Sequence, residues 1–206
     1  MNNIFNVYIE GFNLTGDLYQ DITLFFTLNN DQRTLEHTLN VADEAKRIAE
    51  RFEIDPDKVI QASLLHDISN VIPVSKMLNA AEELSIEILD EERKYSRSVH
   101  QKLSKCMAQE IFNITDDEVL SAIESHTTHK SNATTTDKIL FVSDKISWEL
   151  PGEHTYLQEM RTKVYENEID QAIMIYLNHI WDQRNKLKLV HPWLIQAREE
   201  LLLKIS

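Results

Sequence analysis

The stretch "ASLLHDISN", residues 62–70, places two polar side chains, His66 and Asp67, at the end of an apolar helical run. Alanine and leucine favour a helix up to that point. A carboxylate is rarely buried unless it is paired or bound to a metal ion. The stretch therefore predicts a helix end in the core whose polar groups need compensation there.

The residues on either side of this stretch also favour helices. The 206 residues include only three glycines and four prolines, and apolar residues recur at three- and four-residue spacing. The predicted helices cover residues 17–28, 33–52, 55–67, 97–112, 115–126, 134–150, 168–184 and 191–204. Since no segment alternates as a strand would, we expect an all-α protein, a single-domain bundle of roughly eight or nine helices.

Local signals mark some of the helix ends. Asp55 and Pro56 stand where an N-cap and a first helical residue are expected. Thr115 and Glu118 have the spacing of a capping box. Pro-Gly at residues 151–152 is expected to stop the helix 134–150.

The first 30 residues differ from the rest of the chain. They hold two of the three glycines and many of the aromatic residues. We expect residues 1–30 to be an N-terminal extension whose helix, 17–28, packs on the main domain, residues 31–206.

The composition limits the partners and the compartment. The formal net charge of −13 disfavours nucleic acid and anionic membranes as partners. The single cysteine, Cys106, allows no internal disulfide and fits a reducing compartment. Because neither a signal peptide nor an apolar run approaching ~20 residues is seen, we expect a cytoplasmic protein.

Polar residues lie on the apolar faces of several predicted helices, among them His37, His66, His126 and Asp144. Each has an ordinary explanation when taken alone, since a buried histidine is usually hydrogen-bonded and Asp144 could pair with a neighbouring lysine. Taken together, imidazoles and carboxylates suit iron, manganese, zinc or cobalt, and a helical bundle can bring such groups to one point. No cysteine lies in the set, which argues against a structural zinc site of the thiolate type.

Four segments, in this order, resemble the HD-domain superfamily of metal-dependent phosphohydrolases. They read "LEHTLNVADEAKRIAE" (35–50), "SLLHDISNVIP" (63–73), "SVHQKLSKCMAQEIF" (98–112) and "ESHTTHKSNATTTDKILFVSDKI" (124–146). Within the superfamily the chain looks most like the bacterial symmetrical diadenosine tetraphosphate hydrolases of the YqeK type, over about residues 33–200. The resemblance implies an HD-type bundle with an extra N-terminal helix.

The resemblance also implies a metal site. The family's ligands match His37, His66, Asp67, His100, His126 and Asp144. They would hold two divalent or mixed-valence metal ions, iron by the family's pattern, with Mn, Co or Zn as alternatives. Asp67 would bridge the ions. One ion would lie among His37, His66 and Asp144, and the other between His100 and His126. The expected catalytic residues are Asp67, His100 and His126.

The implied reaction is hydrolysis of a phosphoanhydride in a nucleoside polyphosphate, and foremost the symmetrical cleavage of diadenosine tetraphosphate to two ADP. Two close metal ions can hold both the attacking and the leaving oxygen of such a displacement. Two alternatives stay open: a related HD hydrolase acting on another nucleotide, and a nucleotide- and metal-binding sensor with little or no catalysis. The expected partner is a small-molecule nucleotide, and a homodimer stays open.

Residues near the ligand segments are expected to contact the substrate. They are Thr127, Thr128, Lys130, Lys138, Lys145, Arg97 and Asn70, with solvated surface or helix capping as the ordinary alternative. Asn70, His129 and Lys145 stand where the family typically has lysine, glycine and tyrosine. The family's arginine after the last aspartate is missing from "SDKISWELPG" (143–152). Since a neutral amide adds no positive charge to a phosphate pocket, these departures concern the substrate and not the metals.

Other conspicuous residues are expected to be structural. His154, His179 and His191 show no metal-ligand spacing, Trp148, Trp181 and Trp193 are expected in the core or an interface, His129 at the surface, and residues 91–94 as a solvated charge run.

Overall fold

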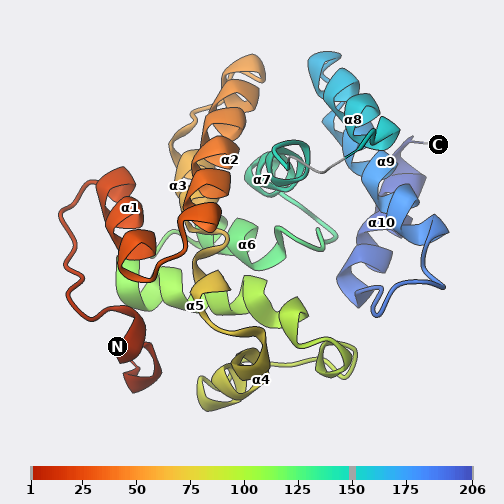
Figure 1. Cartoon of the computed structure of the whole chain (residues 1–206). Coiled ribbons are helices and arrows are strands. Elements are labelled where there is room, and N and C mark those ends of the chain that lie inside the picture. The colour runs from red at the N-terminus through yellow and green to blue at the C-terminus, as the bar shows by residue number, and fades with distance from the viewer. Residues whose placement is uncertain (1, 149–151, 206) are drawn as a thin grey trace.

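The computed structural model describes residues 2–148 and 152–205, and in that part of the chain ten α-helices form a bundle without a β-strand (Figure 1). The helices are α1 (Leu18–Leu28), α2 (Gln32–Arg51), α3 (Asp57–Leu65), α4 (Val74–Glu83), α5 (His100–Phe112), α6 (Asp117–Ser125), α7 (Thr135–Ile146), α8 (Thr155–Tyr165), α9 (Ile169–Asp182) and α10 (Pro192–Ile205). Short 3₁₀ helices are η1 (Asn3–Tyr8), η2 (Ile68–Val71), η3 (Glu92–Lys94) and η4 (Ser96–Val99). The predicted all-α fold is confirmed.

Helices α2, α3 and α7 form the centre of the bundle. Helix α2 packs along both α3 and α7, and α6 packs on α3, α5 and α7. Helices α8, α9 and α10 lie together at one end of the molecule, and α1 lies at the opposite end (Figure 1). The predicted metal ligands described below come from the central helices and from α5 and α6 or directly follow them.

Two apolar cores meet along helix α2. Leu35 and Val41, toward its start, belong to a core shared with α1, α3, α4, α5 and α6. Ala45 and Ile48, toward its end, belong to a core shared with α7, α8, α9 and α10. The apolar stripe of α2 is long enough to serve both cores, because a helix rises about 1.5 Å per residue and this one has 20 residues.

The N-terminal segment completes the first core. Phe5 of η1 and Phe25 of α1 are fully buried there. The ring of Phe25 packs edge-on against Phe112 of α5, with 5.6 Å between centroids. The helix predicted at residues 17–28 is therefore present and packed on the main body, with Asp17 as its N-cap. The division of the chain at residue 30 stays a prediction.

Two predicted helix starts are wrong by a residue or more. Helix α3 begins at Asp57 with Pro56 as N-cap, one residue later than predicted, although the Asp55 carboxylate accepts the Asp57 N–H as a capping side chain would. Helix α6 is capped by Asp116, whose carboxylate accepts the N–H groups of Glu118 and Val119. No capping box forms with Thr115, since the Glu118 carboxylate is taken by Lys58 and Thr136.

Other differences concern helices α4, α7 and α8. Helix α7 ends at Ile146, with a C-cap at Ser147. The helix was predicted to residue 150, but residues 147 and 148 are not helical, and the stop expected at Pro151 falls on residues 149–151, outside the described part of the chain. Helices α4 and α8 were not predicted. Among the described residues, no helix combines the length and the apolar character that crossing a bilayer would require.

Candidate metal centre

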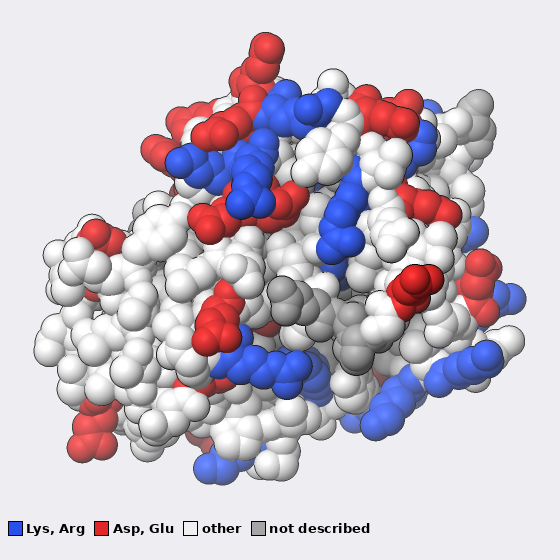
Figure 2. Space-filling view, turned by 45° about the horizontal axis from the view of Figure 1, so that its top comes forward, with Lys and Arg blue, Asp and Glu red and all other residues white. Residues whose placement is uncertain are grey.

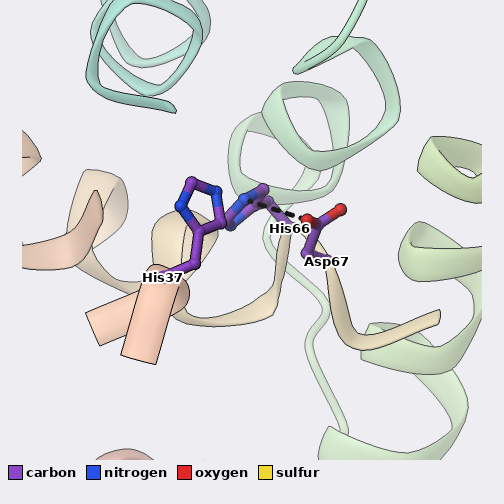
Figure 3. Close-up of side chains that lie close together, drawn as sticks. All are labelled: His37, His66 and Asp67. Carbon is purple, nitrogen blue, oxygen red and sulfur yellow. Dashed lines mark ion pairs between the residues drawn. The ribbon is translucent and has the colours of Figure 1, made fainter. Parts of the chain in front are cut away.

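The six predicted ligands come from five helices of the bundle. His37 lies on α2 and Asp144 on α7. The others stand at helix ends: His66 is the C-cap of α3 and Asp67 follows it, His100 is the first residue of α5, and His126 is the C-cap of α6. All are buried except His37, which is nearly so. His37, His66 and Asp67 point toward one another (Figure 3).

Asp67 lies between two groups of nitrogen donors. Its Oδ2 is 3.7 Å from Nε2 of His66. Its Oδ1 is 3.4 Å from Nε2 of His100 and 3.5 Å from Nε2 of His126. Two sets of donor atoms are each close enough together to hold an ion. One set is His37, His66 and Asp67, and the other is Asp67, His100 and His126. One carboxylate can therefore reach two ions.

Asp144 completes the first group. Its Oδ1 is 3.0 Å from Nε2 of His37 and 3.7 Å from Nε2 of His66. Its Oδ2 is 2.5 Å from the ammonium group of Lys145. Lys145 thus holds one oxygen of Asp144, while the other faces the two imidazoles.

Three of the histidines are oriented in the same way. Nδ1 of His66, His100 and His126 donates to the backbone carbonyl three residues earlier, at 2.6, 2.7 and 2.8 Å. Because the proton is on Nδ1, the lone pair of Nε2 points into the site, which is the tautomer of a metal-binding imidazole. Nε2 of His100 and Nε2 of His126 are 3.1 Å apart. Two lone pairs at that distance repel each other unless a cation lies beside them.

Burial and the neighbouring charges determine the protonation of the site. Burial by itself would raise the pKa of Asp67, but the imidazoles around it outweigh that effect and lower it. For Asp144, Lys145 and His37 similarly hold the pKa well below its usual range. Burial lowers the pKa of His100 to about 3, and it also lowers the pKa of His126. Ionised carboxylates and neutral imidazoles are the forms in which these groups bind metals.

The surroundings of His66 favour a bound cation most clearly. Burial alone would lower its pKa, but Asp67 and Asp144 outweigh burial and raise it. Its Nε2 and the Oδ1 of Asp67 are buried without a hydrogen bond within the described residues. A positive charge between His66 and the carboxylates would satisfy both. The donor set, imidazole nitrogens and carboxylate oxygens without a thiolate, fits Fe, Mn, Co or Zn.

Four of the seven predicted substrate contacts lie next to this centre. Thr127 Oγ1 is 3.0 Å from Nε2 of His100. Thr127 and Thr128 both line a cavity that reaches His100. Asn70 and Arg97 line a second cavity that also reaches His37 and Asp67.

The three lysines behave differently from the expectation. Lys145 is at the centre, but its buried ammonium group is bound to Asp144 and to the carbonyl of His126. Lys130 and Lys138 are not brought to the centre, because their ammonium groups pair with Asp137 and Asp170, at 2.9 and 2.7 Å.

Arg33 and Trp148 lie in the second cavity and were not predicted as site residues. Arg33 lines the cavity of Asn70 and Arg97. Trp148 lines it too, with its ring 4.2 Å from that of His37 and its Nε1 donating to Asp144. A signal for both was available, since Arg33 precedes His37 by four residues and Trp148 follows Asp144 by four, and residues so spaced share a helix face.

Other residues expected to be ordinary surface are buried. Glu92, in the predicted charge run, is fully buried and binds Lys102 at 2.7 Å and His191 at 3.2 Å. His129 is buried against Phe141 with a φ of +58°. That left-handed conformation explains why a glycine is typical at this position of the family.

Positive charge is local on the face shown in Figure 2. Lys and Arg side chains are interleaved there with Asp and Glu, and no broad basic surface is formed.

Comparison with known proteins agrees with this geometry. The HD domain family model matches residues 34–149. An "Uncharacterized protein in pepC 5'region" from Lactococcus lactis subsp. cremoris is 40% identical over 153 residues, 74% of this chain and 77% of that protein. A protein named "Bis(5'-nucleosyl)-tetraphosphatase, symmetrical" from Staphylococcus aureus is 31% identical over 147 residues, 69% of this chain and 72% of that protein. The crystal structure of a predicted HD superfamily hydrolase involved in NAD metabolism, from Clostridium acetobutylicum, superposes with a TM-score of 0.81 at 28% identity, over 90% of this chain and 97% of that one.

Proposed function

The chain belongs to the HD domain family, and from that premise we propose that it is a metal-dependent phosphohydrolase that splits diadenosine tetraphosphate symmetrically into two ADP. The observation that carries the proposal is the convergence of the six donors, with Asp67 facing both groups. The name of the Staphylococcus aureus relative supports the substrate.

The roles proposed for the ligands follow from their positions. His37, His66 and Asp144 would hold one ion, His100 and His126 the other, and Asp67 would bridge them. Iron is the metal we propose, with Mn, Co or Zn as alternatives of the same donor preference. Ions bound there would supply the positive charge that stabilises a phosphoryl displacement and the acidity that activates a water molecule.

The remaining residues orient the site and its substrate. Lys145 holds Oδ2 of Asp144, which leaves Oδ1 for the centre. The Thr127 backbone N–H donates to Gln101, so the hydroxyl of Thr127 is held beside His100, where a phosphate oxygen could accept its proton. Arg97 and the Asn70 amide can donate to further phosphate oxygens from the cavity wall.

The experiment that tests the function separates products by chromatography. The purified, metal-loaded protein is given diadenosine tetraphosphate, ATP, ADP and NAD, the last because the Clostridium acetobutylicum structure is described as belonging to NAD metabolism. ADP as sole product from diadenosine tetraphosphate is expected. ATP plus AMP would contradict symmetrical cleavage, turnover of NAD or a mononucleotide alone would select a different substrate, and bound metal without any turnover would select the sensor.

The metal assignment has its own test. His66→Ala combined with Asp67→Ala is expected to abolish metal binding measured by elemental analysis, because these residues contribute to both donor groups. His179→Ala, which removes a histidine stacked on Tyr156 outside the donor sets, is the matched control and should retain the metal. Unchanged metal content in the double variant would contradict the proposed centre. The cytoplasmic location and the homodimer stay predictions.

A further inference from the structure

Two cavities flank the proposed metal centre, and they differ in chemistry. The apolar cavity, about 250 Å³, is lined by Tyr95, Tyr176, Ile180, Leu187, Leu189 and Leu194 and ends at His100 and Thr127. The polar cavity, about 400 Å³, contains Arg33, Asn70, Arg97 and Trp148 and ends at His37 and Asp67. Arg97 lines both cavities, so they meet at its side chain beside the centre.

The apolar cavity has the lining of a nucleoside site. Aliphatic and aromatic walls with a few polar groups at one end are typical of small-molecule pockets. Small-molecule pockets typically measure about 300–1,000 Å³, so a cavity of about 250 Å³ is small and suits a ligand of the size of one nucleoside. Packing holds Tyr176 of the cavity wall in place, since its ring lies edge-on against Phe141. His191, also in the wall, is held by the buried Glu92.

The polar cavity lacks a lining of aliphatic side chains, but it contains two arginines that have no ion-pair partner among the described residues. Neither Arg33 nor Arg97 has an ion pair or a hydrogen bond to its guanidinium group within the described residues. The carboxylate of Asp31, at the same cavity, is engaged as N-cap of α2 through the Thr34 N–H. Guanidinium groups bind phosphate in a bidentate manner.

Trp148 offers little to a second nucleobase. One face of its indole is covered by the ring of His37, and its N–H is bound to Asp144. The two cavities are therefore unequal, although a dinucleoside polyphosphate is symmetrical.

Resting on the proposed function, we infer that the site recognises a single nucleoside, in the apolar cavity, and takes the far part of the polyphosphate chain in the polar cavity through Arg33 and Arg97. Arg33 supplies there the charge that Asn70 does not. A second nucleoside is dispensable, so the substrate class extends to nucleoside 5'-polyphosphates with a free terminal phosphate.

The test measures equilibrium binding of two probes to the metal-loaded protein by calorimetry: adenosine, which lacks phosphate, and methylenediphosphonate, which lacks a nucleoside and resists hydrolysis. Metal content is verified after each titration. Ile180→Trp, which fills the apolar cavity, should weaken adenosine binding about tenfold or more and leave methylenediphosphonate within about twofold. Leu187→Trp, at an exposed position of the same wall, repeats the test in case Ile180→Trp does not fold.

Arg33→Gln should have the opposite effect. Loss of a charge-assisted hydrogen bond should weaken methylenediphosphonate about tenfold and leave adenosine within about twofold. The matched control is Arg47→Gln on the same helix, whose guanidinium binds Glu44 away from both cavities; it should change neither affinity. An Arg33→Gln effect on adenosine, or equal effects of both substitutions on both probes, would overturn the inference.

Competition completes the design. The competitors carry methylene bridges in place of the bridging oxygens of the polyphosphate chain, so that they resist hydrolysis. In this form adenosine 5'-tetraphosphate should displace ADP from the wild-type protein as well as diadenosine tetraphosphate does, within about threefold. A requirement for both nucleosides would overturn the inference. These readouts do not depend on turnover, so a protein that fails to hydrolyse diadenosine tetraphosphate would contradict the proposed function and leave the binding result to stand by itself.

Discussion

Asp67 illustrates how much one residue contributes to this centre. Its oxygens face different imidazole groups, and its charge is the one that burial would otherwise disfavour. A bridging carboxylate contributes to two sites at once, so its loss should affect both ions. We therefore propose it as the most sensitive of the six ligands.

Asp67→Asn is expected to lower metal affinity by more than about tenfold while leaving the helical content unchanged, because the amide keeps the shape and removes the charge. Metal titration monitored by elemental analysis, with circular dichroism for folding, measures this. Asp182→Asn at the end of α9 removes a carboxylate outside the donor groups and should bind metal as the wild type does. Full metal occupancy in Asp67→Asn would contradict the bridging role.

Glu92 is a second residue whose role depends on its surroundings. Burial alone would raise its pKa, but the hydrogen bonds from His191 and Lys102 outweigh burial and lower it. A carboxyl whose pKa is lower in the folded state stabilises the fold above its unfolded pKa, and this contribution is lost as the pH falls toward the folded value.

Glu92→Gln should therefore lower the free energy of unfolding by about 3 kcal/mol at neutral pH, since it leaves Lys102 buried without its charge partner. The difference from the wild type should shrink as the pH falls below the ordinary glutamate value of 4.5. Urea unfolding over a pH series measures both. Glu91→Gln, at the neighbouring position, is the control, and an equal effect there would show that the buried pair is not the cause.

At the scale of elements, helix α7 begins with a capping box formed by Thr134 and Asp137. The Asp137 carboxylate accepts the Thr134 N–H and also pairs with Lys130. Since α7 carries Asp144, the cap orients a helix that serves the centre ten residues further on.

Thr134→Ala should lower the free energy of unfolding by about 1 kcal/mol, the usual effect of losing an N-cap. Metal affinity should change little, because the later turns of α7 are held by both neighbouring helices and the second core. Thermal and urea unfolding compare it with Thr135→Ala, an exposed position in the first turn. A loss in Thr135→Ala as large as that in Thr134→Ala would argue against the capping box as its source.

At the scale of the whole molecule, the proposed centre joins five helices that are far apart in the sequence. An ion bound to groups from α2, α3, α5, α6 and α7 exists only in the folded chain, so binding should stabilise the fold by about 2.7 kcal/mol when the metal concentration is a hundred times its Kd. We expect the metal-loaded protein to unfold several degrees above the chelated protein in calorimetry. The double variant His66→Ala with Asp67→Ala, which disrupts both donor groups, should lose this difference, and its persistence there would place the stabilising ions elsewhere.

The N-terminal segment also acts on the whole molecule. Phe25→Ala should destabilise the fold by about 3–5 kcal/mol, because it opens a cavity between α1 and α5. Urea unfolding measures the loss, and Tyr19→Ala on the exposed face of α1 is the control. A Phe25→Ala effect no larger than that of the control would mean that residues 2–30 are dispensable to the core.

The sequence by itself determined most of the helices and supplied the six residues proposed as donors. Periodicity and composition are local properties, so α2, α5, α9 and α10 were predicted within a few residues of their ends, and the "HD" doublet stands at the helix end where it was expected. A helix cap was less predictable, because Asp116 and Thr115 both offer a capping oxygen and only the contacts of Glu118 with Lys58 and Thr136 remove the alternative.

The tertiary structure alone decided which charged groups are free. Lys130, Lys138 and Glu92 look alike in a sequence, but their partners are fixed by packing: Glu92 meets His191, 99 residues away, and Lys138 meets Asp170 on α9. Arg33 and Arg97, in the cavities, have no ion-pair partner among the described residues for the same reason. Charge pairing depends on distances through space of a few ångströms, which helical spacing cannot supply, whereas the tendency to form a helix is a local property of the residues in it.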